Sequence, residues 1–583
     1  MLGPVSQTIE NLRGLISAAI SEAVGEGLLP TPSSPLPDFL IERPSDPTLG
    51  DFASNAAMAS AKAFGRPPRV IAQAIADKLN LSGTEFEKVE IAGPGFINFF
   101  VSGSWFSNII LRVLADKDSY GRTDYGCGKK VMVEFVSANP TGPMHMGNAR
   151  GGAIGDSLAA AMDAAGYNVS REFLINDAGN QIEKFGMSLE ARYLQQLNGE
   201  DSIEFPEGGY PGADITEHAK NYIAEFGDKL LNIPSDERRK ALCSFALPLN
   251  KEKMKADLSL YRISFDCWFS ESSLHDSGAV KRAVDTLSSR GFTYEKDGAV
   301  WYKNREVLTK NMLAAGKTQE QIDQLDLKDD VLIRANGFPT YFAADIAYHS
   351  NKLVDRGFDL AINIWGADHH GHVARLKGAL DAVGVGGEKL DIVLMQLVRL
   401  TRDGKPVRMG KRIGNAITLS DLLDEVPVDA ARFFFNMREP GSAFDFDLNL
   451  AVEQTSQNPV YYVQYAHARA CSILKNLAAE GINLLPCSNE QLRLLSDPAE
   501  RELIRALAVL PEEIIMAAKN YDPARLTRWL IDTAASFHRF YNACRVKTED
   551  ENLVQARLSL VAAFKISIAN VLKMLKIDTP EIM

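Results

Sequence analysis

A chain of 583 residues and 64.0 kDa is about four times as long as a typical domain, which favours several domains over one. With 46% hydrophobic and 24% charged residues, the composition excludes a mostly disordered, collagen-like or fibrous chain. The formal charge of −12, from 63 Lys+Arg and 75 Asp+Glu, argues against a protein that coats nucleic acid or an anionic membrane through bulk positive charge. A local basic groove remains compatible with this balance.

The first part of the chain has the pattern of a small α+β domain, which we place at residues 1–120. A Pro-rich connector at 30–47 divides it. Apolar spacing predicts helices on both sides of the connector, and a Gly-Pro-Gly turn joins two strands near the end. The expected elements are helices over 9–24, 51–64 and 68–81 and a strand pair within 89–101.

Strands and helices alternate over residues 121–450, as in a Rossmann-like domain with a parallel sheet. The helix over 147–166 is dense in Gly and Ala, which predicts close packing against a neighbouring element. Charged helices and Gly-rich turns interrupt the alternation over about 190–325, so we expect a partly inserted region there. The expected strands are 131–136, 171–176, 331–335, 360–365 and 390–400, and the other expected helices are 341–354 and 370–383.

Residues 451–583 have helical period almost throughout, which predicts an all-α bundle as the third domain. The expected helices are 459–477, 490–510, 512–519, 524–544 and 553–575.

The six cysteines lie far apart and form no C-x-x-C pair, so neither a disulfide framework nor a zinc ribbon is indicated. The N-terminus lacks the basic and apolar regions of a signal peptide, and the chain lacks a run of about 18 apolar residues. We therefore expect a soluble cytoplasmic protein that does not associate with membranes.

The densest chemical signal is the stretch from Ser137 to Gly151, which follows the strand at 131–136. Prolines such as Pro143 fix a tight strand-to-helix turn, and His145, Gly147 and Asn148 fall where the helix begins. Backbone N–H groups at a helix N-terminus, joined by imidazole and amide donors, make a site for phosphate. Gly147 would also allow an adenine ring to approach the backbone. A chance match to so short a motif is the alternative.

A second motif at 407–415 contains Arg408, Met409, Lys411 and Arg412 on a Gly-punctuated loop. A solvated basic loop would explain it without any function. Paired with the first motif at the far end of the same domain, it is a candidate for a mobile clamp on a triphosphate.

With these motifs the chain resembles the class I aminoacyl-tRNA synthetases, and among them the arginyl-tRNA synthetases, over nearly its whole length. Within the catalytic part the resemblance rests on E-F-V-S-A-N-P-T-G-P-M-H-M-G-N-A-R at 134–150, W-G-A-D-H-H-G-H at 365–372, D-A-A-R-F-F-F at 429–435 and F-D-F-D-L at 444–448. Outside it, the matching stretches are G-D-F-A-S-N at 50–55, A-G-P-G-F-I-N at 92–98, N-P-V-Y-Y-V-Q-Y-A-H-A-R at 458–469 and F-H-R-F-Y-N-A-C-R-V at 537–546.

Two departures from the family pattern bear on the chemistry. Asn148 stands where the first signature has its second His, and an amide can donate a hydrogen bond but cannot carry charge. In the second motif, Arg408 stands for the first Lys and Gly410 for the Ser, whereas Lys411 keeps the second Lys position. These changes affect the expected rate and loop rigidity more than the expected reaction.

The resemblance implies a buried pocket for arginine, whose planar guanidinium is matched by carboxylates and aromatic faces. Tyr341 and Asp345 share one helix face and match the family's guanidinium-binding pair; a core Tyr with a surface Asp is the alternative. Glu134 and Asn139 would contact the charged groups of the substrate, and such a contact would give Glu134, an acid within an apolar strand, its partner. Glu271 is a further candidate, with a surface acid as the alternative.

The resemblance also implies that the turn from Gly366 to His372 borders adenine, ribose and amino acid, with Gly366 and His369 on the nucleotide side and Asp368 on the amino-acid side. Its three histidines suggest a metal site, but adjacent histidines point in different directions, and we expect no protein-bound zinc.

The resemblance implies ATP-dependent activation of L-arginine to arginyl-adenylate, followed by transfer to arginine tRNA. ATP would bring Mg²⁺, with His145, Asn148, Arg408 and Lys411 stabilising phosphate charge. We expect a monomer, with an additional tRNA-contacting domain at 1–120 and an all-helical anticodon-binding domain at 451–583. Another class I synthetase and a catalytically silent tRNA-binding paralogue are the alternatives. The candidate RNA contacts, some of which could be core residues instead, are Tyr461, Tyr462, Tyr465, Arg469, His538, Arg539 and Tyr541.

Overall fold

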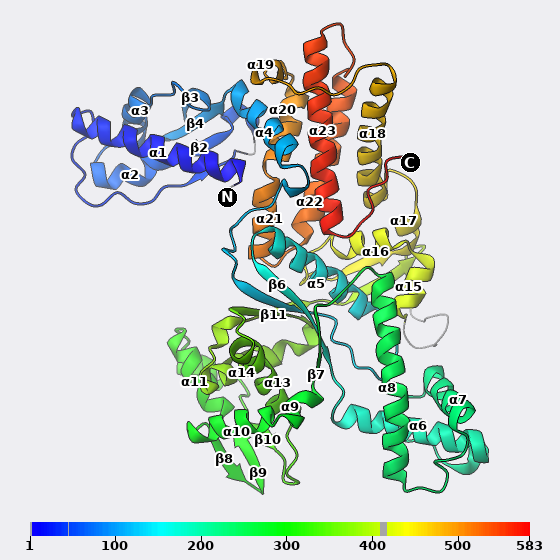
Figure 1. Cartoon of the computed structure of the whole chain (residues 1–583). Helices are drawn as coiled ribbons and strands as arrows, with labels where there is room; N and C mark the ends of the chain where they lie inside the picture. The colour runs from blue at the N-terminus through cyan, green and yellow to red at the C-terminus, as the bar shows by residue number, and fades with distance from the viewer. Residues whose placement is uncertain (1–2, 45, 408–416) are drawn as a thin grey trace.

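The computed structural model describes residues 3–44, 46–407 and 417–583, and Figure 1 shows their arrangement. An N-terminal α+β domain and a C-terminal helical bundle both lie on one side of a central parallel sheet, with two lobes on the other side. The predicted fold class, an α/β catalytic domain between an α+β domain and an all-α bundle, is confirmed.

The N-terminal domain combines four helices with an antiparallel sheet of order β1-β2-β4-β3. One expectation is wrong here: Phe52–Ser54 is a strand, and the Ala-rich helix begins only at Ala56. Phe52 is buried and pairs with Phe99 in the sheet, so packing overrides the local helical pattern. The elements are α1 (Pro4–Gly25), β1 (Ile41–Glu42), β2 (Phe52–Ser54), α2 (Ala56–Phe64), α3 (Pro68–Lys78), β3 (Phe86–Ala92), β4 (Phe96–Val101) and α4 (Gly103–Asp116).

Five parallel strands form the central sheet in the order β12-β11-β5-β6-β7. The chain runs outward from β5 in both directions, so the strand order reverses between β5 and β11. Ligands of such sheets bind outside the carboxyl ends of the strands at this switch point. The strands are β5 (Lys130–Glu134), β6 (Asn168–Ile175), β7 (Cys267–Ser270), β11 (Leu360–Gly366) and β12 (Leu390–Met395).

Helix α5 (Met146–Ala164) lies against the central sheet, over β5, β6 and β11, as the density of small residues predicted. A Cβ atom on Gly155 would lie 2.2 Å from Cγ of Phe135, and one on Gly152 would lie 2.7 Å from Cδ1 of Ile263. Larger residues would push the helix off the sheet, so these glycines set the position of its N-terminus.

Two predicted strands are assigned differently by the structure. The stretch 331–335 gives β10 (Asp330–Ile333), which pairs antiparallel with β9 (Ala299–Tyr302) and, through it, joins β8 (Thr293–Lys296) outside the central sheet. The stretch 390–400 breaks at Gln396, whose N–H donates to the carbonyl of Pro440. Its second part, β13 (Val398–Arg402), joins β14 (Lys405–Pro406) and β15 (Phe444–Asp447) in a separate sheet.

Two lobes extend from the carboxyl ends of the sheet strands (Figure 1). Helices α6 (Asn180–Asn198), α7 (Ala213–Phe226) and α8 (Ser235–Leu260) form one lobe with its own apolar core. The other packs α9–α14 around β8–β10. Strand β7 belongs to the central sheet, although it lies within residues 190–325, the region that the sequence predicted to be partly inserted. The helices of the second lobe are α9 (Ser272–Asp276), α10 (Ala279–Ser289), α11 (Asn304–Ala314), α12 (Gln319–Asp323), α13 (Tyr341–Ser350), a π-helical turn (Asn351–Asp355) and α14 (His370–Val383).

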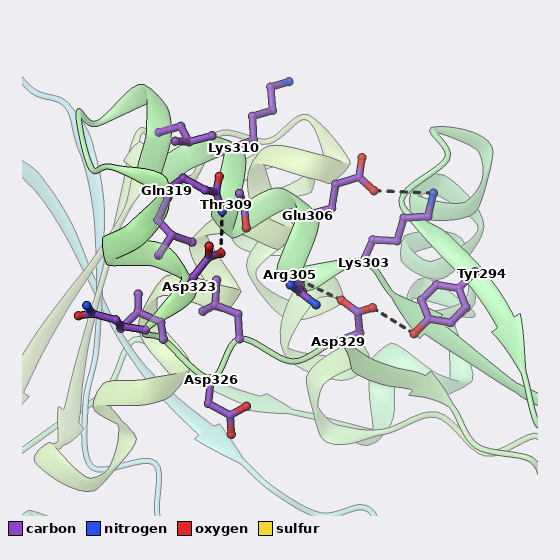
Figure 2. Close-up of a pocket in the computed structure, with 15 residues that line it drawn as sticks. Tyr294, Lys303, Arg305, Glu306, Thr309, Lys310, Gln319, Asp323, Asp326 and Asp329 are labelled. Atoms are coloured by element: carbon purple, nitrogen blue, oxygen red, sulfur yellow. Dashed lines mark hydrogen bonds and ion pairs between the residues drawn. The ribbon is translucent and has the colours of Figure 1, made fainter.

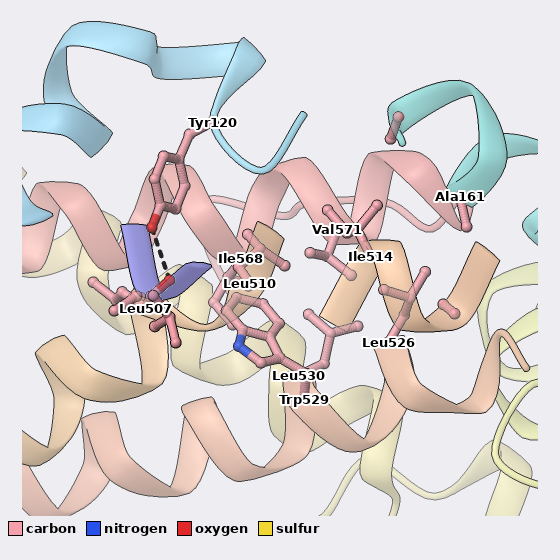
Figure 3. Close-up of a cluster of buried hydrophobic side chains, with 14 of the residues drawn as sticks. Tyr120, Ala161, Leu507, Leu510, Ile514, Leu526, Trp529, Leu530, Ile568 and Val571 are labelled. Atoms are coloured by element: carbon pink, nitrogen blue, oxygen red, sulfur yellow. Dashed lines mark hydrogen bonds between the residues drawn. The ribbon is translucent and has the colours of Figure 1, made fainter. Parts of the chain in front are cut away.

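The C-terminal helices continue the core of the sheet domain (Figure 3). Tyr120, which follows α4, donates from its hydroxyl to the carbonyl of Leu507 at 2.8 Å, and Ala161 of α5 lies in the same apolar cluster. The helices are α15 (Leu419–Glu425), α16 (Val428–Phe435), α17 (Leu448–Val452), α18 (Pro459–Ala479), α19 (Asn489–Leu492), α20 (Pro498–Ala508), α21 (Leu510–Lys519), α22 (Ala524–Ala543) and α23 (Glu551–Met574).

Helix α23 is long and apolar enough to cross a membrane by length and composition alone. However, 67% of its most apolar stretch is buried, and the helix packs against α18, α20, α22 and α4. Its apolar character is therefore that of the central helix of a bundle.

Candidate active site

The carboxyl ends of β5 and β11 open onto two adjoining cavities, of about 1030 Å³ and about 460 Å³. Ser137, Asn139, Gly366 and His369 line both, so one ligand can extend from one cavity into the other. The larger cavity brings together Pro143, His145, Gly147, Asn148, Gly366, Asp368 and His369. The smaller cavity brings together Glu134, Asn139, Glu271, Tyr341 and Asp345.

His145 and Asn148 cap the first turn of α5 reciprocally. The N–H of Gly147 donates to Nδ1 of His145 at 3.1 Å, and the N–H of His145 donates to Oδ1 of Asn148 at 3.0 Å. Burial lowers the pKa of His145, so the ring is neutral and carries its proton on Nε2. Nε2–H of His145 and the NH₂ group of Asn148 are therefore the donors that this turn can offer to a ligand.

Gly147 leaves space for this cap. A Cβ atom at position 147 would lie 3.0 Å from Cε1 and 3.2 Å from Nδ1 of the His145 ring. The glycine thus makes room for the imidazole, which is a role besides the approach of an adenine ring predicted from the sequence.

Strained backbone follows β5. Val136 and Ser137 have φ angles of 67° and 42°, which is unusual for side chains with a Cβ and costs on the order of 1–3 kcal/mol each. The bend directs the Ser137 hydroxyl to Oε1 of Glu134 at 2.9 Å, and the N–H of Leu174 donates to the same hydroxyl at 3.2 Å. The strained turn therefore fixes the wall that the two cavities share.

Glu134 ends β5 and is buried, with hydrogen bonds to both carboxylate oxygens. In addition to Ser137, the buried ammonium group of Lys352 forms an ion pair with Oε2 at 2.5 Å. The partner that we expected from a substrate is thus supplied by the protein. Glu134 nevertheless lines the smaller cavity, and carboxylate oxygens can accept further hydrogen bonds.

Tyr341 and Asp345 both face the smaller cavity from α13, as their spacing predicted. Oδ2 of Asp345 is 2.8 Å from Nε2 of His372, whose Nδ1 accepts from Nε of Arg375 at 2.6 Å. The Tyr341 hydroxyl accepts from the N–H of Asn180 at 3.0 Å. Both side chains are therefore held in place by neighbouring elements before any ligand binds.

Glu271, directly after β7, is 6% exposed, and its Oε2 has no hydrogen-bond partner within the part of the chain that is described. Burial, and then the nearby carboxylates of Asp345 and Asp177, raise its pKa to about 7. The interpretation of Glu271 as a surface acid is wrong. A buried carboxyl group without a partner is suited to a cationic ligand.

Asp368 lies apart from the other candidates for amino-acid binding. It lines only the larger cavity, and its side chain is 82% exposed.

Arg408, Met409 and Lys411 lie outside the described residues. The first residues described after them lie beside the first motif. The N–H of Met146 donates to the carbonyl oxygen of Ile417, and the N–H of Leu419 donates to the carbonyl oxygen of Met144.

Several residues in or directly beside the smaller cavity escaped the sequence analysis as binding candidates. Gln181 accepts from the Asn139 amide, while His372 contacts Asp345 and Lys352 pairs with Glu134. Gln181 and Lys352 are polar residues on helices, where the default expectation is solvent exposure, so only the tertiary structure reveals them.

A separate hollow of about 1190 Å³ lies between α11, α12 and the segment 323–329 (Figure 2). Its polar groups largely satisfy one another: Asp329 accepts from the hydroxyl of Tyr294 and the N–H of Arg305, and Asp323 accepts from Gln319. The described candidate residues for ATP or amino-acid binding all lie elsewhere. Across the described ranges, no group of three or more His, Cys, Asp or Glu side chains is arranged to hold a metal ion.

The candidate RNA contacts gather on one face of α18 and α22, which we term the aromatic face: Tyr461, Tyr462, Tyr465, Arg469, His538, Arg539 and Tyr541. All seven are at least partly exposed, although Tyr462 also packs against the apolar core, as expected for some of them. Tyr461 and Tyr465 stack with 6° between their ring planes, and Arg469 lies 4.7 Å from the ring centres of Tyr465 and Tyr541. Burial and Arg469 lower the pKa of His538 to about 4.

Comparisons with known proteins indicate one protein family over nearly the whole chain. Family models for the arginyl tRNA synthetase N-terminal domain, the class I (R) tRNA synthetase catalytic domain and the DALR anticodon binding domain match residues 10–101, 109–441 and 463–583. Arginine–tRNA ligases of Caldanaerobacter subterraneus and Acetivibrio thermocellus are 54% and 52% identical to this chain, each over 99% of both chains.

Solved structures show the same fold. Arginyl-tRNA synthetase of Thermus thermophilus has a TM-score of 0.71 and 22% identity over 97% of this chain and 99% of that one. The enzyme of Plasmodium falciparum has a TM-score of 0.70 and 17% identity over 99% of each chain. The family model of the catalytic domain covers more than half of the sequence and the relatives align over its full length, so the chain belongs to the arginyl-tRNA synthetase family.

Proposed function

We propose that this protein joins L-arginine to ATP, forming arginyl-adenylate and pyrophosphate, and then transfers the arginyl group to the terminal adenosine of arginine tRNA. The observation that carries the proposal is the smaller cavity, in which Asp345 and the buried Glu271 lie beside Tyr341. Two carboxylates and an aromatic ring suit a guanidinium group, which is planar, always charged and able to donate several hydrogen bonds.

The larger cavity is the proposed site for ATP, which brings Mg²⁺ with it. The arginine carboxylate attacks the α-phosphate in line, so catalysis consists of positioning and charge stabilisation. Nε2–H of His145 and the Asn148 amide donate to the α-phosphate at the positive end of α5. Arg408 and Lys411 stabilise the departing pyrophosphate, with Met409 beside the nucleotide.

Gly366 and His369 border the nucleotide where the two cavities meet. Pro143 and Gly147 line the larger cavity around the His145 turn. The exposed Asp368 is on the same side, so its contact with ATP or the adenylate is a better proposal than one with free arginine. Asn139, with its amide bonded to Gln181, is available to the α-amino group together with Glu134.

The aromatic face of α18 and α22 is the proposed contact for the anticodon of arginine tRNA, because unpaired bases stack on aromatic and guanidinium planes. The N-terminal α+β domain is a further tRNA contact. We infer that the protein acts as a monomer, since one chain contributes the described residues of both proposed sites. We further propose that it works in the cytoplasm without membrane association, as expected of a translation enzyme.

The test is ATP–pyrophosphate exchange with each of the twenty amino acids, with and without tRNA. We expect exchange with arginine alone, and expect it to require tRNA, as the family resemblance implies. Exchange driven by another amino acid would show a different class I synthetase, while tRNA binding without aminoacylation would show a silent paralogue.

A further inference from the structure

A row of buried polar side chains crosses the sheet beneath the smaller cavity. Asn363 of β11, Glu134 of β5 and Glu172 of β6 are register partners in parallel strands, so they point to the same face of the sheet. Each is at most 4% exposed. Two buried carboxylates side by side need two cations nearby, because isolated buried charges are very costly.

Lys352, in the π-helical turn after α13, and Arg356, directly after that turn, supply these cations. Arg356 donates to both carboxylate oxygens of Glu172. The ammonium group of Lys352 is fully buried; it pairs with Oε2 of Glu134, donates to Oδ1 of Asn363 at 3.2 Å, and lies 4.0 Å from the ring centre of Tyr348. Lys352 falls within the π-helical turn Asn351–Asp355, an irregularity that often accompanies functional sites.

Asn363 extends the chain of hydrogen bonds to the other end of the cavity. Nδ1 of His349 lies 2.8 Å from the carbonyl oxygen of Asp345, and a carbonyl only accepts, so Nδ1 carries the proton. Nε2 of His349 therefore accepts from the Asn363 amide at 2.9 Å. Burial, and then Lys352, lower the pKa of His349 to about 3, which keeps the ring neutral in this tautomer.

We propose that Lys352 is a positioning residue for amino-acid binding: its ammonium group fixes the Glu134 carboxylate and, through Asn363 and His349, joins it to the backbone of Asp345. The two acids proposed to contact opposite ends of arginine are thereby held by one continuous chain, Glu134–Lys352–Asn363–His349–Asp345. Lys352 itself does not line either cavity. The inference rests on the proposed function, since arginine is the ligand concerned.

Lys352→Met tests the proposal because it removes the cation and nearly keeps the length of the side chain. In pyrophosphate exchange at saturating tRNA, we expect the KM for arginine to rise about tenfold or more, because both ends of the pocket lose their fixed geometry. The KM for ATP should stay within about twofold, since the larger cavity keeps its own supports. Lys352→Arg, which retains the cation, should recover most of the arginine affinity.

Arg432→Met is the matched control for stability. Arg432 and Asp156 form an equally buried ion pair on α16 and α5, away from the smaller cavity, with both side chains fully buried. We expect Arg432→Met to lower Tm without a selective change in the arginine KM. Equal changes in the KM values for arginine and ATP in Lys352→Met, or an unchanged arginine KM, would overturn the positioning role.

Asn363→Leu serves if Lys352→Met fails to fold, because it breaks the chain and leaves the Glu134–Lys352 pair intact. We expect a selective rise of roughly threefold in the arginine KM, since one link of the chain is lost. A change in Tm alone would overturn the proposal. If the wild-type protein shows no exchange with arginine, it is the proposed function that fails and not the role of Lys352.

Discussion

At the scale of single residues, the ionisation of Glu271 is the property that a substrate would sense first. Its pKa, raised to about 7 by burial and by Asp345 and Asp177, means that the carboxyl group holds its proton below neutral pH. Arginine remains a cation throughout this range. Binding of the guanidinium should therefore favour the ionised form of Glu271 and release a proton.

We expect the KM for arginine to fall as the pH rises from about 6 to about 8, by up to about tenfold per unit below the pKa of Glu271. Exchange kinetics at fixed saturating ATP and tRNA measure this directly. Glu271→Gln should abolish the dependence and leave the KM near its low-pH value, because the amide cannot ionise. A variant that keeps the wild-type pH profile would assign the titration to another group.

Individual polar residues were predictable from the sequence when they broke an apolar pattern or sat in a dense motif. Glu134 within a buried strand and His145 at a strand-to-helix turn are of this kind. Lys352 was not, because a lysine late in a helix has the pattern of a solvated residue. Its burial results from two acids on separate strands, which only the parallel register of β5, β6 and β11 brings together.

At the scale of elements, α5 carries the proposed phosphate donors, and small residues set its distance from β5. Gly155→Ala places one methyl group 2.2 Å from Cγ of Phe135, which cannot move far within the core. We expect a loss of about 1–3 kcal/mol in the free energy of unfolding and a lower kcat, because the N-terminus of α5 shifts. Denaturant unfolding and exchange kinetics measure the two effects.

The same substitution on another helix provides the control. Gly14 in α1 is exposed, and a Cβ atom added there would have no described heavy atom within 4 Å outside its own helix backbone and chain neighbours. Gly14→Ala should stabilise the protein by about 0.5–1 kcal/mol and leave kcat unchanged, since alanine favours helix. A Gly155→Ala variant as stable and active as Gly14→Ala would mean that α5 does not depend on this contact.

Elements with clear periodicity were predictable from the sequence. Elements whose place depends on contacts with distant segments of the chain were not. The helix 370–383 has the bounds expected from its pattern. The apolar run 390–400 instead divides between two sheets, because Gln396 is held by Pro440 from a distant segment. Strand β10 has the composition of a buried parallel strand, yet its antiparallel partner β9 decides its place.

At the scale of the whole molecule, the charge balance separates the domains. Residues 451–583 contain 15 basic and 15 acidic residues, so the acidic excess belongs to the first 450 residues. The helical bundle therefore cannot hold RNA by net charge and must use arranged groups. The aromatic face meets this need: Arg469 is held between two tyrosine rings, and Arg539 pairs with Glu502.

Tyr461→Ala tests this face because its ring stacks on Tyr465 and remains partly exposed. Stacking of a base on an aromatic ring contributes about 1–3 kcal/mol, so we expect the KM for tRNA in aminoacylation to rise about tenfold or more. The KM values for arginine and ATP at saturating tRNA should not change, since the cavities lie on a different domain.

Tyr125→Ala is the control, because Tyr125 is 44% exposed and packs against Tyr167 away from the bundle face. If exchange requires bound tRNA, Tyr461→Ala should also lose arginine activation at low tRNA and regain it at high tRNA. Loss that persists at saturating tRNA would instead indicate damage to the fold, and an unchanged tRNA KM would remove this face from the tRNA contact.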